Sequence, residues 1–344
     1  MTTFNVMMPV AGVLALPFLP LLNELVRRSD VDALPIGEGP CVDYPRRAAQ
    51  WLDALRASAR GAPPAPDDAP PPPGGAPPAP DDAPPPWQAL GLRVEHVDAL
   101  RLARGDRRDG VLYADHTISL GAGAHAAYAF AEERLEMRAG ATLGGFAYAP
   151  NVDIDNTLVR GAVVGQAVRV HGCGGFANLH GTPIVFGRLA HAPGRDAALT
   201  PRRAMSLSGR LAGVPHRVLG GRYLVARDIR LPSHTILHGT LIVDGRLTLG
   251  EGCVLIGSVK AHSVVLECDA LLNGAVFARD DVLLDEASCI DGVVSAGGLL
   301  RLTGARIGAA DHPVSACARD VSVVGHACVH GDLVAWRSGW YHAS

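Results

Sequence analysis

A repeating pair of aliphatic residues is the feature that most constrains how this chain can fold. Two bulky apolar residues stand at positions i and i+2, and the pair returns roughly every 17 residues over 100–170 and again over 229–323. In a β-strand, residues at i and i+2 lie on one face. The pattern therefore predicts one short inward-facing strand per coil of a solenoid. The pairs are Leu100 with Leu102, Ile118 with Leu120, Leu135 with Met137, Val152 with Ile154, Val168 with Val170, Ile229 with Leu231, Leu247 with Leu249, Val264 with Leu266, Val282 with Leu284, Leu300 with Leu302, and Val321 with Val323.

A further column of residues follows each C-terminal pair. Five residues after the pair stands an inward candidate, and three residues later a glycine suits a sharp corner, because glycine reaches positive φ without steric cost. The inward candidates are Ile236, Val254, Leu271, Cys289, Ile307 and Cys328, and the glycines are Gly239, Gly257, Gly274, Gly292 and Gly331. We therefore predict an all-β fold, a parallel β-helix of about 17–18 residues per coil. The varying coil length favours the right-handed form.

Composition limits the function classes. Hydrophobic residues make up 48% of the 344 residues and aromatic residues only 5%, so aliphatic side chains must build the core. A net charge of −3 gives no basic face for nucleic acid. The seven cysteines form no CxxC pair, which disfavours a zinc ribbon or disulfide framework and fits a reducing compartment.

The segment 1–28 predicts a membrane anchor. No charged residue occurs before Glu24, and the apolar run is near the lower length limit for a span. Pro9, Pro17 and Pro20 leave open whether it spans or re-enters, and a buried helical hairpin is the alternative. Arg27 and Arg28 follow the run, which predicts an inner-membrane protein with its C-terminal body on the cytoplasmic face. The anchor residues are Val6, Val10, Val13, Leu14, Leu16, Phe18, Leu19, Leu21 and Leu22.

Two segments connect this anchor to the coils. Residues 29–57 form a juxtamembrane region, in which Trp51, Leu52 and Leu55 have helical spacing. Residues 58–87 contain the 12-mer GAPPAPDDAPPP twice. Repeated proline favours extended polyproline II, so we expect a disordered, semi-rigid spacer of roughly 80 Å between anchor and body.

The remaining boundaries follow the repeat. N-terminal coils are predicted over 88–181, an irregular loop or junction over 182–222, further coils over 223–336 and an aromatic tail over 337–344. Trp336, Trp340 and Tyr341 concentrate aromatic side chains near the C-terminus. They are predicted to cap the last coil or to contact another subunit, since an uncapped coil end can pair with another chain.

Candidate sites for chemistry are weak. The pairs His234 with His238 and His326 with His330 occupy equivalent corners five coils apart, so they cannot share a metal. Asp153 and Asp155 point outward together, and Asp280, Asp281, Asp285 and Glu286 form a second acidic patch; both are typical of a solvated face. No P-loop, GxSxG or HExxH motif is present. We predict no enzymatic activity, no catalytic residues, no metal and no cofactor.

The stretch 223–335 resembles the bactofilins, a polymer-forming bacterial cytoskeletal family. The resemblance lies in YLVARDIRLPSHTILHGTLIVDGRLTLGEGCVLIGSV and ECDALLNGAVFARDDVLLDEASCIDG, with their aliphatic pairs and corner glycines. It implies head-on assembly of β-helices without nucleotide, membrane attachment, and a scaffold role for envelope or polysaccharide machinery. The implied partners are other copies of the chain, the inner membrane and unidentified envelope-biogenesis proteins.

Two alternatives stay open. One is a β-helix that binds or modifies polysaccharide, and the other is a metal-dependent hexapeptide-type enzyme. The extra N-terminal coils depart from the family pattern, because they could cover the surface through which bactofilins polymerise.

Overall fold

The computed structural model describes residues 43–60, 85–187, 203–204, 216–219 and 222–343. The chain divides into two compact units, Met1–Glu38 and Gly39–Ser344, and every described residue belongs to the second. The predicted anchor 1–28 and most of the segments 58–87 and 182–222 lie outside the described residues.

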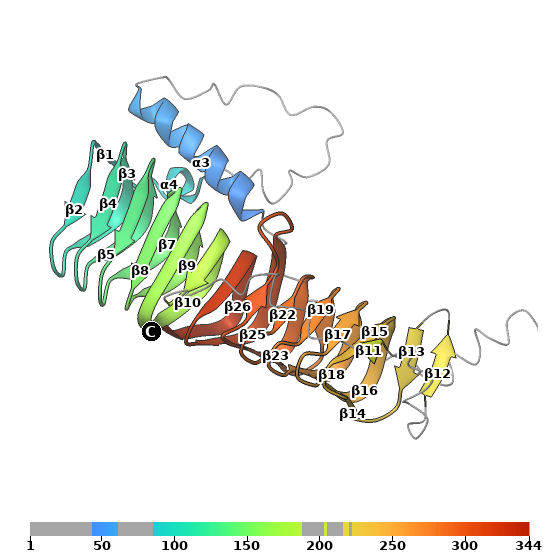
Figure 1. Ribbon diagram of the computed structural model, residues 1–344. Helices are drawn as coiled ribbons and strands as arrows, with labels where there is room; N and C mark the ends of the chain where they lie inside the picture. The colour runs from blue at the N-terminus through green and yellow to red at the C-terminus, as the bar shows by residue number, and fades with distance from the viewer. Residues whose placement is uncertain (1–42, 61–84, 188–202, 205–215, 220–221, 344) are drawn as a thin grey trace, which may run out of the picture. The chain divides into compact units, whose positions relative to one another are not determined.

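The second unit contains a parallel β-solenoid of about 13 turns, which confirms the predicted all-β solenoid (Figure 1). Its handedness stays a prediction. In the N-terminal coils each strand pairs in parallel with the equivalent strand of the next coil. These strands are β1 (Val94–Val97), β2 (Leu100–Leu102), β3 (Arg107–Ala114), β4 (Thr117–Leu120), β5 (His125–Ala131), β6 (Arg134–Met137), β7 (Thr142–Tyr148), β8 (Asn151–Asp155), β9 (Leu158–Val164) and β10 (Ala167–Phe186).

The C-terminal coils follow the same plan over a longer stretch, and at their start β12 pairs antiparallel with its neighbour β13. Their strands are β11 (Arg203–Ala204), β12 (His216–Leu219), β13 (Arg222–Val225), β14 (Ile229–Leu231), β15 (Thr235–His238), β16 (Thr240–Leu249), β17 (Val254–Ile256), β18 (Val259–Leu266), β19 (Leu271–Asn273), β20 (Val276–Ala278), β21 (Val282–Leu284), β22 (Cys289–Ile290), β23 (Val294–Thr303), β24 (Arg306–Ile307), β25 (Val314–Val324) and β26 (Ala327–Ala343).

The aliphatic pairs stack directly on one another. Leu100 is paired with Ile118 in the next coil, and Leu302 is paired with Val323. Each buried Val, Leu or Ile contributes about 1.5–3 kcal/mol, and stacking on its copies in adjacent coils is what removes it from water. The buried members of the C-terminal pairs are Ile229, Leu231, Leu247, Leu249, Val264, Leu266, Val282, Leu284, Leu300, Leu302, Val321 and Val323.

A third inward strand completes each coil. Val259 and Ala261 are buried, and Val276 and Ala278 stack upon them in the next coil. Valine stacks on valine and alanine on alanine along this side, and the next coil continues both columns with Val294 and Ala296. Because alanine is not a bulky apolar residue, this strand does not stand out in the aliphatic pattern.

In most of the C-terminal coils the middle strand departs from the sequence-based register by one residue, whereas the predicted Ile307 is buried in the inward column, next to Ile290. Leu255 and Leu272 have 0% exposure, whereas the predicted Ile236 and Leu271 are only partly buried. A corner residue with positive φ precedes these strands, as at His234 and Asp269. That corner changes which of the following side chains faces inward, so the alternation cannot be counted through it.

One left-handed corner recurs in nearly every coil. The backbone N–H of Gly123 donates to the carbonyl of Ala139 at 3.1 Å, and Gly252 donates to Cys268 at 3.0 Å. Glycine, asparagine and aspartate favour this conformation, and Ala287 adopts it at a cost of about 1–2 kcal/mol. The corner residues are Gly105, Gly123, Gly140, Asn156, Gly172, His234, Gly252, Asp269, Ala287, Gly304 and Gly325.

The predicted corner glycines form a separate column, in which the backbones of successive coils approach closely. A Cβ on Gly257 would overlap the carbonyl of Gly239, and a Cβ on Gly274 would overlap that of Gly257. Gly257 also has φ +147°. These positions therefore need glycine for lack of space as well as for conformation.

The two sets of coils meet through their C-terminal coils. Strand β10 ends the N-terminal set, β26 ends the C-terminal set, and the two pair antiparallel from Gly172–Ala343 to Phe186–Ala327 (Figure 1). All coils therefore form one continuous stack. The stretch expected to be an irregular junction begins as ordered β10, and most of the expected C-terminal tail belongs to β26.

Helices α3 (Tyr44–Ala59) and α4 (Pro86–Ala89) lie on the outside of the N-terminal coils. The Asp43 carboxylate accepts the Arg46 N–H at 3.1 Å and caps α3. Along α3 the buried residues Ala48, Trp51, Leu52 and Leu55 share one face. The three large residues among them are those whose spacing indicated a helix.

Candidate assembly surfaces

The junction between the coil sets has an aromatic interior. Phe176 and Phe186 have ring centroids 6.1 Å apart, and Phe186 lies 6.1 Å from Tyr341. All three are buried. The Tyr341 hydroxyl accepts the backbone N–H of Thr157 at 3.1 Å, and burial raises the pKa of this phenol. Side chains from both sets thus seal the solenoid where the strand direction reverses.

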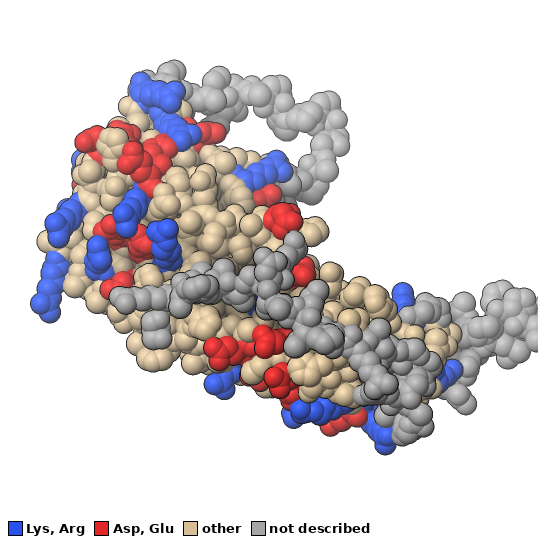
Figure 2. Space-filling view, viewed as in Figure 1, with Lys and Arg blue, Asp and Glu red and all other residues tan. Residues whose placement is uncertain are grey.

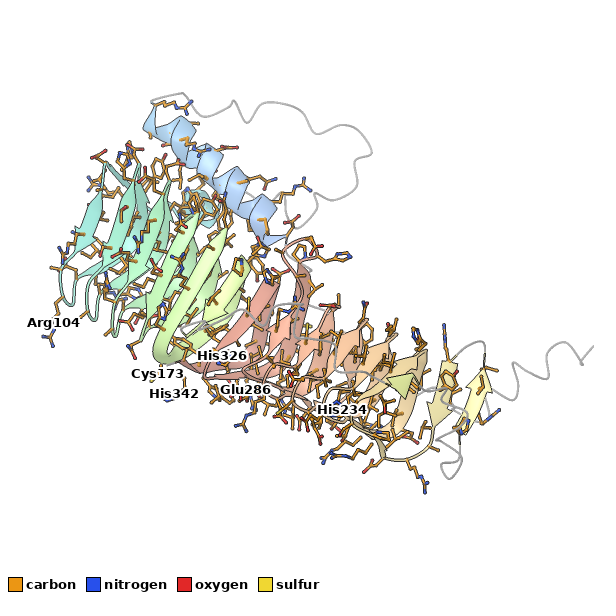
Figure 3. All side chains as sticks on the ribbon, viewed as in Figure 1. Arg104, Cys173, His234, Glu286, His326 and His342 are labelled. Atoms are coloured by element: carbon orange, nitrogen blue, oxygen red, sulfur yellow. The ribbon has the colours of Figure 1, made fainter. Side chains whose placement is uncertain are left out.

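Polar pairs bridge the same junction. His180 Nδ1 lies 2.6 Å from Asp332 Oδ1, and the hydroxyl of Ser315 donates to the other Asp332 oxygen at 2.8 Å. On the outer corner, Cys173 Sγ lies 3.3 Å from His342 Nδ1. Figure 3 labels both residues at this corner. The His180 and Cys173 contacts each join β10 to β26, so contacts on two sides of the coil hold the sets together.

The C-terminal aromatic residues have different surroundings. Tyr341 is 3% exposed, whereas Trp336 and Trp340 are 49% and 44% exposed. The open side of the last coil is paired with β10 rather than covered by these rings. Trp340 is opposite Gly175 across the junction, so it faces outward beside the seam.

The first coil presents strand edges. Strands β1 and β2 each pair with a strand on one side only among the described residues. Val97 and Leu100 are partly buried and pack against the end of the core. Charged groups surround this end, including Arg108, which lies 3.6 Å from Glu95, and Arg104, which extends away from the coils (Figure 3). Such charges discourage indiscriminate edge pairing.

The opposite end of the stack is built differently. Strand β12 pairs antiparallel with β13, from His216–Val225 to Leu219–Arg222. On its other side β13 pairs in parallel with β16. Strand β13 is therefore paired on both sides, unlike β1, whereas β12 and β14 each pair on one side only among the described residues.

An aromatic face covers one side of the N-terminal coils. We use the term aromatic face for the outward residues Val111, Tyr113, Tyr128, Phe130, Phe146, Tyr148, Ala162 and Val164 on β3, β5, β7 and β9, which join α3 and Trp87 in a core separate from the solenoid interior. Trp51 of α3 lies 4.8 Å from Phe146 and 5.2 Å from Trp87, measured between ring centroids. Much of the small aromatic content of the chain gathers in this one place.

A charged network closes one edge of the covered aromatic face. The Arg56 guanidinium makes two hydrogen bonds to the Glu132 carboxylate, at 2.7 and 2.5 Å. The Tyr113 hydroxyl donates to the same carboxylate at 2.8 Å. The Arg56 hydrogen bond holds the pKa of Glu132 below its ordinary value, and burial followed by the Glu132 bond raises the pKa of Tyr113 to about 12. Arg56 thus gives α3 a charge-assisted contact as well as an apolar one.

Docking of α3 alters the expected arrangement of the linker. Because α3 precedes the proline-rich repeats and packs on the coils, both flanks of that segment, Arg60 and Trp87, belong to the same body. The repeats therefore do not space the predicted anchor from the coils. Only residues 29–43 separate them, a stretch that spans at most about 50 Å.

The histidines considered as candidate sites lie apart, and the carboxylates bond to neighbouring side chains or backbone groups. His234 and His326 lie apart along one edge of the C-terminal coils (Figure 3). Asp153 bonds to Arg134 at 2.6 Å, and the Asp281 carboxylate accepts the Leu299 N–H at 2.8 Å. Within the described ranges, no three His, Cys, Asp or Glu residues are grouped to hold a metal ion. Acidic and basic side chains intermingle on the surface of the N-terminal coils (Figure 2).

Two cysteines of the predicted inward column stack with an arginine between them. Arg306 is paired with Cys289 on one side and Cys328 on the other, and its guanidinium donates to Cys289 Sγ at 2.8 Å. Burial raises the pKa of Cys289 to about 12 and that of Cys328 to about 11. Both thiols stay protonated at neutral pH, so neither is a nucleophile there.

The helices among the described residues are too short or too polar to cross a membrane, and the predicted anchor residues are outside that part of the chain. No family model, curated protein or solved structure matches the chain. The structure places the predicted core pairs inside the coils, and it adds two surfaces that the sequence did not indicate: the antiparallel junction and the aromatic face.

Proposed function

We propose that this protein is a membrane-tethered, non-catalytic β-helical scaffold of bactofilin type, which self-assembles without nucleotide and organises envelope or polysaccharide machinery. The β-solenoid is consistent with such a role. The observation that carries the proposal is the junction itself. Within one chain, two solenoid ends already join through antiparallel backbone pairing between β10 and β26.

The edge of the first coil supplies the contact between copies. The junction occupies one end of each coil set, which leaves β1 and β2 as edges available to a second chain. Pairing of two first-coil edges, antiparallel as at the junction, would join two copies end to end. Because such a two-fold contact closes on itself, growth into a filament also uses the opposite end, where β12 pairs on one side only among the described residues. The proposed attachment is to the inner membrane, with the body on the cytoplasmic side and held within about 50 Å of the anchor.

Backbone hydrogen bonding at β1 offers a direct test. The carbonyls of Arg93 and Val97 accept from Val111 and Asp115 of the next coil. Because bonding direction alternates along a strand, the N–H of His96 points to the open side. His96→Pro removes that donor, whereas His96→Ala keeps it and also loses the imidazole, which makes it a matched control.

Electron microscopy of the full chain in mild detergent without nucleotide gives the readout. Filaments or ordered arrays are expected for the natural sequence and for His96→Ala, and clearly shorter ones for His96→Pro. Monodisperse monomers at high concentration, or equal lengths for all three proteins, would contradict end-to-end assembly. A C-terminal reporter fusion tests the side of the membrane, and an exported body would contradict the proposed location.

A further inference from the structure

The helix α3 is joined to the coils by a linker much longer than the gap that it closes. Trp51 of α3 and Trp87 of α4 have ring centroids 5.2 Å apart. The stretch from Trp51 to Ala59 rises about 12 Å along a helix, so the linker needs to span on the order of 15 Å. The linker is the segment 61–84, and many of its residues are proline. In polyproline II conformation a segment of this length covers about 75 Å.

This mismatch weakens docking within one chain. The effective concentration of a tethered group is greatest when the length of the tether matches the distance to its site, and falls when the tether is longer. Proline-rich sequences in general resist bringing their ends together more than glycine-rich ones do. The effective concentration of the helix at its own site is therefore lower than a short loop would give.

The same linker reaches a neighbouring solenoid. A coil of about 17 residues has three sides of roughly six residues, which is about 20 Å per side at about 3.3 Å per residue. The aromatic face of a second copy lying alongside is within a reach of about 75 Å. No new contact chemistry is needed, since the second copy offers the same aromatic face and the same Glu132.

We propose that α3 also docks on the aromatic face of a second copy of this chain, so that copies exchange helices and are linked side by side. The second copy is the partner because the interface is complementary to α3 itself, through Trp51, Leu52 and Leu55 in the apolar part and Arg56 at Glu132. In dilute solution docking within one chain dominates. In an assembled or membrane-bound array, the local concentration of neighbouring faces favours exchange.

This inference deepens the proposed scaffold role, on which it rests for the crowding of copies, but it uses a different surface. End-to-end pairing involves β1 and β2, whereas exchange involves α3 and the aromatic face. A chain that cannot form filaments can still exchange helices, and the two failures can be told apart.

Crosslinking between two full-length variants tests the exchange. One chain carries Arg56→Cys and the other, with a different affinity tag, carries Glu132→Cys. Since each chain holds only one of the two substitutions, a short bismaleimide crosslink between positions 56 and 132 can form only between copies. Mass spectrometry of the crosslinked peptides separates this product from links to the natural cysteines. The double variant in one chain measures docking within the chain.

Matched substitutions on α3 show whether docking itself is responsible. Leu52→Asp, added to the Arg56→Cys chain, places a charge in the buried face and should lower the crosslink between copies by at least about tenfold. Ala49→Asp, on the exposed face of α3, should leave it unchanged. Removing residues 61–74 leaves a linker that still spans the gap within one chain, and should lower exchange severalfold.

Charge reversal gives a second readout without a crosslinker. Arg56→Glu and Glu132→Arg each place like charges together within one chain, while mixing the two chains restores opposite charges at the exchanged interface. A dimer of one Arg56→Glu chain and one Glu132→Arg chain should co-purify through both tags. Two differently tagged copies of the same variant should not.

The outcomes separate the two proposals. A crosslink found only in the double variant, at concentrations where copies assemble, would overturn helix exchange, and filaments in that sample would leave the scaffold proposal intact. Crosslinked dimers without filaments would support exchange and count against end-to-end assembly.

Discussion

The N-terminal and C-terminal coils share an interior but differ on the outside. The outward column that begins at Val111 passes through Tyr128 and Phe146 in the N-terminal coils. The same column continues across the junction into Val334 and Cys317, and then into Ser295, Phe277 and Lys260. The aromatic half carries α3, whereas no described helix covers the mixed half. The inward residues thus build the solenoid, and the outward residues decide what binds to each part of it.

Removing the contact between α3 and the aromatic face should destabilise the N-terminal coils only. We expect Trp51→Ala to cost about 3–5 kcal/mol of local stability, because Trp51 is 7% exposed and packs on Phe146. Phe277→Ala on the mixed half should cost less than about 1.5 kcal/mol, since Phe277 is already 38% exposed. Hydrogen exchange read by mass spectrometry should show faster exchange in β5 and β7 for the first variant and no change there for the second. Equal effects would mean that α3 does not stabilise this face.

The glycines of the two halves should tolerate a methyl group unequally. Gly257→Ala in the C-terminal coils should lower the free energy of unfolding by about 3 kcal/mol, because the new Cβ overlaps the backbone of Gly239 and the φ of +147° is strained for alanine. Gly123→Ala in the N-terminal coils has φ +69° and open space around the Cβ. Its cost should be about 1 kcal/mol. Denaturant unfolding of both variants checks this, and a reversed order would contradict the close-approach argument.

The stability of the junction that joins the halves should depend on the hydroxyl of Tyr341. Tyr341→Phe keeps the ring but leaves the buried N–H of Thr157 without this partner, at a cost of about 1–3 kcal/mol. Burial raises the pKa of Tyr341. Stabilisation by the neutral phenol is therefore complete below the ordinary pKa of 10.0 and is lost as the pH rises through the raised value.

Thermal unfolding between about pH 7 and about pH 11 measures both effects. The Phe variant should start lower and lose less stability at alkaline pH. Trp340→Phe is the control, because Trp340 is half-exposed beside the seam, and its effect should stay within about 0.5 kcal/mol.

The smallest loss of stability is expected from the pair of Arg56 and Glu132 at the edge of the covered aromatic face. Arg56 holds the pKa of Glu132 below its ordinary value of 4.5. The stabilisation from that lowered pKa is fully present above pH 4.5 and is lost as the pH falls through the lowered value. Glu132→Gln should therefore reduce the acid sensitivity of α3 docking while costing about 0.5–1 kcal/mol at neutral pH.

Tryptophan fluorescence of Trp51 followed from about pH 7 to about pH 3 reads this out. Asp53→Asn is the control, because Asp53 bonds to the same guanidinium but lies within α3 and is exposed. An unchanged acid profile for Glu132→Gln would show that another group controls docking.

Sequence reasoning was strongest where the contacts repeat. The pairs Leu247 with Leu249 and Val264 with Leu266 are bulky, regularly spaced and stacked between adjacent coils. Their spacing in the sequence therefore identifies the residues on which they stack. It failed by one residue at Leu255 and Leu272, because the left-handed corners at His234, Gly252 and Asp269 interrupt the alternation. It also missed the inward Ala261 and Ala278, which are too small to mark a strand by hydrophobicity.

The surfaces could not be predicted in the same way. The partner of α3 lies on β5, β7 and β9, and nothing in the spacing of Trp51, Leu52 and Leu55 names Phe146 as its contact. The pairing of Cys173 with His342 joins residues that are far apart in the chain and occurs once. A single contact leaves no period to detect.

The amino-acid sequence by itself determined that the chain coils, since stacking equivalent aliphatic positions is how such short strands bury their faces. Tertiary structure alone decided that the two sets of coils meet end to end in opposite directions and that a helix returns to cover one side. Antiparallel pairing between β10 and β26 depends on backbone groups that every residue carries, and helix docking depends on a surface assembled from several coils. Neither has a local signature.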